Sequence, residues 1–461
     1  MRRLCFLLAA AVGVSSCALG PDYERPEIET PEEFRESSDQ GPSLANVEWW
    51  KIFQDPQLNT LINAALDESK DLAFATARLE EARARLGFVR ANQYPRLDIN
   101  AGANRGNSVE QFIPDAGIQN NYVVSADLSF EVDLFGKLRR SSESARAELL
   151  ASEETRKTVY ISLIADVAST YFLLRDLDAR YEIAARTLAT RRDSTNIIRE
   201  RFKHGTTPML DVNQAEIQEA QAAADLAAFE RQVVQAENLL SILIGRNPGP
   251  IVRGDALVDQ VRPPDIPVGL PSELLERRPD VRAAEQLLAA QTARIGVAEA
   301  LRFPSLGLTA SGGLASNDLS DLTGSDAGIW NVGANIFAPL YNAGQNKRNV
   351  EIEIARTEQL LQQYEFAVLQ AFREVEDALV AVRTLDDESA AREMQTRAAR
   401  NAAFLSRARY DGGVTSFLEV LDSERSLFQA EISASSVRRA RMVAIVDLYK
   451  ALGGGWIPET E

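Results

Sequence analysis

The sequence predicts an α+β membrane protein in which one structural plan occurs twice. Two observations support this prediction. A short turn motif recurs 208 residues later in the chain, and segments of alternating apolar and polar residues interrupt very long helical patterns. The motif spans residues 201–212 and again 409–420, with Arg, an aromatic residue, Gly, Leu, an acid and Val in register. The match continues without a gap through 240–245 and 448–453, so an internal repeat is the first feature to explain.

The composition limits the class of protein. The chain has 461 residues, of which 45% are hydrophobic and 25% are charged, so it is neither disordered nor a bundle of membrane helices. A formal net charge of −17 argues against a nucleic-acid partner, which would need a basic surface. His204 is the single histidine, which excludes a His/Cys metal cluster within one chain. The sequence has no phosphate-binding loop or nucleophile elbow, so we expect no enzymatic activity, metal or cofactor.

Residues 1–16 have the features of a signal peptide. Arg2 and Arg3 precede an apolar run over residues 4–14. The run ends in Val-Ser-Ser-Cys17, which resembles the lipobox of bacterial lipoproteins and predicts a covalent lipid on Cys17. The alternative is an ordinary secretory signal with an incidental cysteine. No other apolar run reaches the ~18 residues that a membrane-spanning helix needs, so any passage through a membrane would be made by strands.

Residues 17–55 are polar and rich in proline, which is typical of an extended arm. The aromatic residues Trp49, Trp50 and Phe53 close this arm, and we expect them to dock it onto the body of the protein. A helix is expected from Pro56 to about Asn92, because an acid followed by proline is a typical helix start.

The hydrophobic period then changes from about 3.6 to 2. Apolar and polar residues alternate over 97–103 and 124–133, with an Asn/Gly-rich loop over 104–121 between them. Alternation of this kind is typical of strands in an outer-membrane barrel. A half-buried strand of a soluble sheet gives the same pattern, and the strands alone favour that soluble alternative.

A helical pattern without proline follows from Lys137 to about Lys203, which corresponds to roughly 100 Å at ~1.5 Å per residue. After the turn, apolar residues over 226–243 step by three and four, as in a coiled coil. Repeat 1 therefore covers residues 56–245, and a Pro/Gly-rich linker covers 246–271.

Repeat 2 covers residues 272–455 and follows the same plan, and 456–461 form a tail. A helix is expected at 272–301, and two strands are expected at 306–310 and 332–338 with a loop over 311–328 between them. A second long helix is expected at 345–410.

This plan places four strands in each chain. Four strands leave two unpaired edges, which lipid does not tolerate, and a conventional small barrel has about eight strands. Three chains related by cyclic symmetry would supply 12 strands and would close both the strand layer and the helix layer. The predicted fold is therefore a trimeric 12-stranded β-barrel continued by a long, hollow α-helical barrel.

Several segments also resemble a known family. These segments are Cys17 with Pro21-Asp-Tyr-Glu-Arg-Pro26, Glu131-Val-Asp-Leu-Phe-Gly-Lys-Leu-Arg139, Gly269-Leu-Pro-Ser-Glu-Leu-Leu-Glu-Arg-Arg-Pro-Asp280, Pro304-Ser-Leu306, Leu421-Asp-Ser-Glu-Arg-Ser-Leu-Phe428 and Leu448-Tyr-Lys-Ala-Leu-Gly-Gly-Gly-Trp456. They are similar to the TolC-like outer-membrane efflux factors, in the OprM-type (NodT) lipoprotein branch. The similarity covers nearly all of the mature chain.

The resemblance implies a homotrimer in the outer membrane, anchored by lipid and extended into the periplasm. It would be the passive exit duct of a tripartite pump that expels drugs and other small toxic compounds. Its expected partners are outer-membrane lipid, a periplasmic membrane-fusion adaptor and an inner-membrane RND transporter. A duct for heavy-metal ions or for type I secretion is an alternative. A periplasmic coiled-coil lipoprotein without a pore is another, and the alternating strands oppose it.

The resemblance also assigns the two turns to the periplasmic end, where the adaptor docks. Carried over by position, the expected contact residues are Gly205 and Thr206 in the first turn and Gly413 and Val414 in the second. Gly205 and Gly413 allow a tight reversal of the chain, although any helical hairpin needs such a glycine.

The expected gate lies beside these turns. Glu419 and Asp422 are three residues apart and therefore share one helix face, where threefold symmetry would make rings of carboxylates that favour cations. Both match the family's acidic constriction, although a solvated surface position explains either acid alone. Tyr410 and Asp211 match a latch in which the tyrosine bonds to the acid of the neighbouring hairpin.

One position departs from the family pattern. Some family members carry an arginine where this chain has Thr415. Closure is therefore expected to depend more on packing around Phe417 and Leu418.

Overall fold

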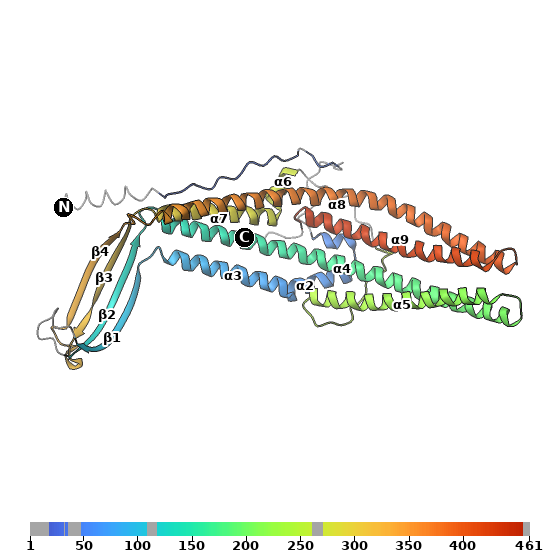
Figure 1. The fold of residues 1–461 in the computed structure, drawn as a ribbon, viewed down its shortest axis with the longest axis horizontal. Helices are drawn as coiled ribbons and strands as arrows, with labels where there is room; N and C mark the ends of the chain where they lie inside the picture. The colour runs from blue at the N-terminus through green and yellow to red at the C-terminus, as the bar shows by residue number, and fades with distance from the viewer. Residues whose placement is uncertain (1–17, 32, 36–47, 108–117, 261–270, 455–461) are drawn as a thin grey trace. The chain divides into compact units, whose positions relative to one another are not determined.

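The structure is a computed structural model (Figure 1), and it describes residues 18–31, 33–35, 48–107, 118–260 and 271–454. The predicted signal peptide, Cys17 and the C-terminal tail lie outside these residues.

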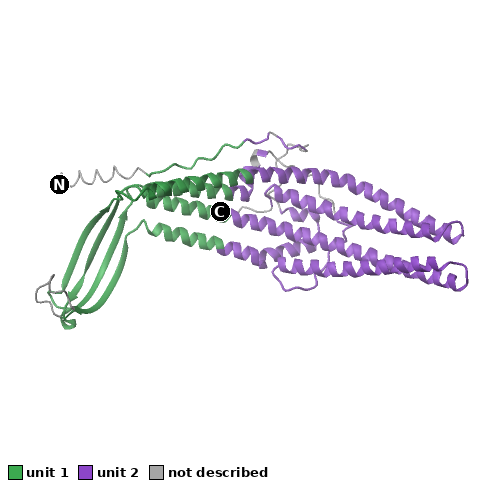
Figure 2. Ribbon diagram, viewed as in Figure 1, with its two compact units in different colours: residues 1–28, 78–153, 283–366 green, residues 29–77, 154–282, 367–461 purple. Residues whose placement is uncertain are grey.

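The chain divides into two compact units (Figure 2). The strand unit comprises residues 1–28, 78–153 and 283–366, and the hairpin unit comprises residues 29–77, 154–282 and 367–461. Each unit takes segments from both sequence repeats, so the compact units do not coincide with the repeats.

The predicted order of elements is confirmed. The helices are η1 (Trp49–Phe53), α2 (Pro56–Glu68), α3 (Lys70–Ala91), α4 (Lys137–Lys203), α5 (Met209–Leu243), α6 (Pro271–Arg277), α7 (Pro279–Ala300), η2 (Leu319–Asp321), α8 (Gln345–Asp411) and α9 (Phe417–Ala451). The strands are β1 (Arg96–Asn107), β2 (Ile118–Val132), β3 (Ser305–Ser316) and β4 (Gly328–Phe337). The long helices α4 and α8 have 67 residues each, as the repeat predicts.

The strand unit contains an antiparallel sheet in the order β1-β2-β3-β4. One row across it consists of Leu97, Leu128, Ala310 and Val332, and the next row consists of Asp98, Asp127, Ser311 and Asn331. The sheet therefore has an apolar face and a polar face, because adjacent rows point to opposite sides. The apolar face is open to solvent in the single chain, where Val332 is 74% exposed. Within the described residues, β1 and β4 each pair on one side only.

The strands are longer than predicted. Residues at both ends of the expected loops, 104–121 and 311–328, belong to strands in the structure. These ends contain Gly and Asn, which are weak strand formers. Close pairing of the backbones explains the extension. A Cβ atom on Gly313 would lie 2.1 Å from the carbonyl oxygen of Val124, so glycine permits the close approach of β2 and β3.

Two predicted helices are each broken once. Ser69 separates α2 from α3, and Arg278 separates α6 from α7. Pro279 explains the second break, because the residue before a proline disfavours the helical conformation. Ser69 has an extended ψ of 133° and is of a residue type that favours the start of a helix. The sequence pattern missed both breaks because one non-helical residue hardly changes the spacing of apolar residues.

One expectation about membrane helices is also corrected. In the described part of the chain, α4 includes an 18-residue stretch that is long and apolar enough to cross a membrane. However, 56% of that stretch is buried within the structure. Its helix contributes Leu163, Val167 and Tyr171 to the core of the hairpin unit. Burial in the protein explains the apolar character.

The N-terminal arm docks onto both units separately. In the strand unit, the Leu19 N–H donates to Phe135 O at 3.1 Å, and the buried Arg140 guanidinium donates to the carbonyl oxygens of Leu19 and Gly20. In the hairpin unit, Trp49 stacks on Tyr449 with ring centroids 5.4 Å apart.

Trp49, Trp50 and Phe53 are all buried in the core of the hairpin unit, as predicted. The next helix starts as expected, because the Asp55 carboxylate accepts the N–H groups of Gln57 and Leu58.

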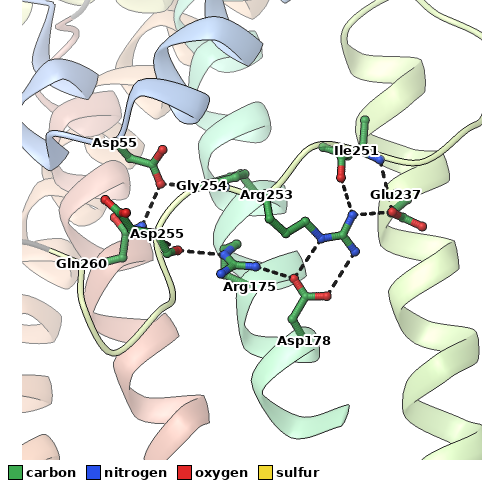
Figure 3. Close-up of polar contacts among 10 residues, drawn as sticks. Asp55, Arg175, Asp178, Glu237, Ile251, Arg253, Gly254, Asp255 and Gln260 are labelled. Atoms are coloured by element: carbon green, nitrogen blue, oxygen red, sulfur yellow. Dashed lines mark hydrogen bonds and ion pairs between the residues drawn. The ribbon is translucent and has the colours of Figure 1, made fainter. Parts of the chain in front are cut away.

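The linker after α5 is fastened to the same core (Figure 3). The Tyr171 hydroxyl donates to the Asp55 carboxylate at 2.5 Å and accepts the N–H of Gly254 at 3.2 Å. The Gln260 amide also donates to Asp55 at 2.8 Å. Burial and the hydrogen bond to the Asp55 carboxylate raise the pKa of Tyr171, so the hydroxyl keeps its proton at all ordinary pH values.

Arg253 of the linker joins helices α4 and α5 (Figure 3). Its guanidinium makes two parallel hydrogen bonds, each 3.1 Å, to the carboxylate of Asp178 on α4, and it also bonds Glu237 on α5. Arg175 donates to the carbonyl oxygen of Asp255 at 2.9 Å. The linker thus braces α4 against α5.

We predict that Gly254→Ala lowers the midpoint of thermal unfolding. A Cβ atom there would lie 2.4 Å from Asp55 Oδ1 and 2.5 Å from the Tyr171 hydroxyl, and overpacking of this kind costs about 1–3 kcal/mol. Gly249→Ala in the same linker is the matched control, because its Cβ would meet only a carbonyl oxygen at 3.9 Å. Equal midpoints for the two variants would contradict the packing argument.

Candidate gate at the hairpin tips

Two helical hairpins define the candidate site, and both tips belong to the hairpin unit. Hairpin 1 consists of α4 and α5, and hairpin 2 consists of α8 and α9 (Figure 1). Their turns have the same geometry. The N–H groups of Gly205 and Gly413 donate to carbonyl oxygens three residues earlier, and those of Thr206 and Val414 donate five residues earlier.

Both turn glycines have a φ of +74°, which residues with a side chain rarely adopt. A Cβ atom at either would meet nothing within 4 Å, so the backbone angle alone requires glycine. The predicted tip residues Gly205, Thr206, Gly413 and Val414 are all exposed at these turns.

An apolar core joins the two hairpins below the turns. Its buried members are Ile198, Val212 and Ala215 of hairpin 1 and Phe417, Val420 and Leu421 of hairpin 2. Phe417 is 2% exposed and lies beside Tyr410, with ring centroids 5.4 Å apart. The expected packing around Phe417 is therefore present. Leu418 is 60% exposed and takes no part in this core.

Leu418, Glu419 and Asp422 line one groove between α5 and α9, with a volume of about 600 Å³. Its other lining residues are Gln214, Ile217, Gln218, Ser416, Leu421 and Arg425. The two acids share a helix face, as their spacing predicts.

Each acid of the groove is paired with an arginine. Glu419 lies 3.4 Å from Arg409 and accepts a hydrogen bond from the Thr415 hydroxyl, and Asp422 lies 2.6 Å from Arg425. Exposed pairs of this kind contribute about 0–1 kcal/mol to stability, so the arginines do not fix the two carboxylates in place.

Arg201 connects the two hairpins at the tip. Its guanidinium carbon lies 4.9 Å from the centroid of the Tyr410 ring, and its Nη2 lies 3.7 Å from Asp411. The described contacts include no hydrogen bond between Tyr410 and Asp211 within the chain. The latch between those two residues stays a prediction for the assembled protein.

Arg201 is not among the predicted gate residues, although the repeat carries a signal for it. Arg201 and Arg409 are the first residues of the two matching motifs, and Asp211 and Glu419 occupy matching positions. In hairpin 2, Arg409 pairs with Glu419. In hairpin 1, Arg201 turns instead to the other hairpin.

The chain combines a sheet that has one apolar face with two long helical hairpins. This combination defines a channel protein whose membrane part is built from strands. A sequence model of the family "Outer membrane efflux protein" matches residues 61–246 and again 270–454. The chain belongs to the outer membrane efflux protein family.

Curated relatives agree with this assignment. The cation efflux system protein CusC of Escherichia coli K12 is 34% identical over 458 residues, which cover 98% of this chain and 99% of CusC. The toluene efflux pump outer membrane protein TtgI of Pseudomonas putida is 35% identical and covers 97% of both chains.

Solved structures agree as well. The open state of the Neisseria gonorrhoeae MtrE outer membrane channel is 36% identical, covers 96% of this chain and 100% of its own, and has a TM-score of 0.85. The outer-membrane channel OprN is 31% identical, with the same coverage and a TM-score of 0.86.

These comparisons confirm the predicted family, fold class and location. The protein is an efflux channel of the outer membrane, and its role is transport. The alternative of a coiled-coil lipoprotein without a pore is rejected.

We predict that Arg201→Ala favours separation of the hairpins, because it removes the contact with the Tyr410 ring and the pair with Asp411. The two interactions together contribute about 1–2 kcal/mol, so the ratio of open to closed channel should rise about five- to thirtyfold in single-channel recordings. Lys203→Ala is the control, because Lys203 pairs with Glu200 on its own helix at 2.7 Å. A ratio that changes equally in both variants would contradict the role of Arg201.

Proposed function

We propose that three copies of the chain form the exit duct of a tripartite RND-type efflux pump. The duct passively conducts drugs and other small toxic compounds from a periplasmic adaptor and an inner-membrane transporter to the outside. The single observation that carries this proposal is the four-stranded sheet. It has one exposed apolar face, and among the described residues each of its edge strands pairs on one side only.

The edge strands support the trimer. Unpaired N–H and C=O groups of β1 and β4 cost several kcal/mol each in lipid, so the sheet must close on itself through further copies. Three copies bring 12 strands, a number within the range of outer-membrane barrels, with the apolar face toward lipid and the polar face toward water.

The hairpin tips support docking of the adaptor and the gate. The turns expose backbone and small side chains, and Val414 is 71% exposed. We propose that Gly205, Thr206, Gly413 and Val414 meet the adaptor. Leu418, Glu419 and Asp422 would face the constriction, with Tyr410 and Asp211 beside it.

The cargo has two candidates. The similarity to the cation efflux protein CusC over nearly the full length of both chains favours cations, and the similarity to the toluene efflux protein TtgI favours small organic compounds at almost the same identity. A passive duct leaves this choice to the pump.

The decisive experiment is conductance of the purified protein in planar bilayers. We predict that the wild-type channel conducts and prefers cations, and that Glu419→Gln with Asp422→Asn shifts the reversal potential toward zero, because two carboxylates per chain leave the constriction. Absence of conductance in all variants, Asp422→Ala included, would refute the duct. Unchanged reversal potentials would remove the two acids from the constriction.

We also propose that residues 1–16 are a signal peptide and that Cys17 carries the lipid anchor. Cys17→Ser should abolish incorporation of labelled palmitate, because the acceptor thiol is lost, and leave the trimer able to fold. Label retained in the variant would refute the assignment of Cys17.

A further inference from the structure

A second charged contact joins the hairpins deeper than the tip, and it involves three residues that we call the inter-hairpin cluster: Arg191 on α4, Arg407 on α8 and Glu424 on α9. Glu424 Oε2 lies 3.5 Å from Arg191 Nη1, and Glu424 Oε1 lies 3.8 Å from Arg407 Nη1. Arg407 also donates to the Ser194 hydroxyl of α4 at 2.8 Å. One carboxylate is thus shared between an arginine of each hairpin.

Glu424 points away from the groove that holds the candidate gate. It follows Asp422 by two residues, which is about 200° around a helix, so the two acids face opposite sides of α9. The Asp422 side chain is 64% exposed, whereas that of Glu424 is 15% exposed. The inter-hairpin cluster is therefore a site separate from the constriction residues.

Arg191 and Glu424 are largely buried without being tightly paired. The Arg191 side chain is only 5% exposed, and its Nη1 atom has no hydrogen-bond partner among the described residues. Burial raises the pKa of the Glu424 carboxyl and lowers the pKa of the Arg191 guanidinium, and in each case the opposite charge offsets burial only in part. A buried ion pair with distances beyond 3.3 Å does not recover the cost of its desolvation.

The internal repeat supplies a direct comparison. Arg199 and Glu216 of hairpin 1 occupy the positions of Arg407 and Glu424, 208 residues earlier. They form an ordinary surface pair at 2.8 Å, with both side chains 44% exposed. In hairpin 2 the same two residue types stand 3.8 Å apart, because Glu424 is shared with Arg191.

Arg191 has no equivalent arginine in hairpin 2. The repeat position of Arg191 in hairpin 2 is Ala399, so nothing in the duplicated pattern requires an arginine there. Glu424 consequently has two possible arrangements. It is either shared between the hairpins, as in the structure, or paired closely with Arg407 alone, as Glu216 is with Arg199. Two discrete arrangements of one contact are what a switching element needs.

We propose that the inter-hairpin cluster is the release point of the gate, and that Glu424 is its positioning residue. Shared between Arg191 and Arg407, Glu424 holds hairpin 2 against hairpin 1. When the hairpins separate, Glu424 closes on Arg407 and water reaches Arg191, so the lost contact is replaced and the separated state becomes accessible. This role rests on the proposed channel function and adds a positioning residue to it.

The test is a double-mutant cycle read by single-channel recording. Glu424→Gln leaves the buried Arg191 without a counter-charge, whereas Arg407 keeps Asp411 at 3.6 Å, and the ratio of open to closed channel should rise about tenfold. Arg191→Met removes the other side of the contact and should also raise the ratio. The double variant should fall short of the product of the two effects, because both remove the same interaction.

Glu216→Gln is the matched control, since it removes the repeat-equivalent acid from an exposed pair within hairpin 1. Its open-to-closed ratio should stay within about twofold of wild type. Glu424→Asp, which keeps the charge, should lie closer to wild type than Glu424→Gln. A merely structural role would lower the thermal midpoint without changing gating, so unfolding is measured in parallel.

Three outcomes would overturn the proposal: an unchanged ratio in Glu424→Gln, an equal change in Glu216→Gln, or fully multiplicative effects in the double variant. If Glu424→Gln does not fold, Arg191→Met against Glu216→Gln decides alone, because an unchanged ratio there also refutes the cluster. Absence of conductance in the wild-type protein would instead refute the channel function itself.

Discussion

The unsatisfied backbone groups at the two edges of the four-stranded sheet are the constraint on which the rest of the structure depends. A sheet with an apolar face can lie in lipid only if no edge remains open. One chain supplies too few strands to close a barrel, so the membrane part forces oligomerisation. Oligomerisation then fixes the helices, which leave the sheet through Gly136 and Gly344 at positive φ and must follow the symmetry of the strands.

Duplication explains why the chain contains two similar hairpins whose matching residues make different contacts. The two copies keep the same turns, the same helix lengths and many of the same charged residues. They differ in which partner each arginine contacts. Arg409 pairs within its own hairpin, whereas the equivalent Arg201 crosses to the other hairpin. Because Arg201 contacts the other hairpin where the equivalent Arg409 contacts its own, two similar hairpins interact with each other.

Periodicity predicted most of the fold, because long helices and alternating strands are local patterns. It predicted α4 at Lys137–Lys203, and the aromatic residues that close the proline-rich arm predicted the docking of Trp49, Trp50 and Phe53. It missed the helix break at Ser69, which depends on one dihedral angle. For the candidate gate, spacing predicted that Glu419 and Asp422 share a face. It could not predict that Glu424 is buried between the hairpins, since that depends on tertiary packing.

The register of the sheet has a consequence for the path of a solute. Asp98 stands opposite Asp127 in the β1–β2 half, whereas the same row continues through Ser311 and Asn331 in the β3–β4 half. Acids placed opposite each other weaken a sheet. Arg96 lies 2.7 Å from Asp98 and offsets part of this charge. In a barrel of three chains, the water-filled interior would alternate three sectors with charged side chains and three neutral ones. A solute that crosses such a barrel would therefore meet charged side chains on only half of the strands around it.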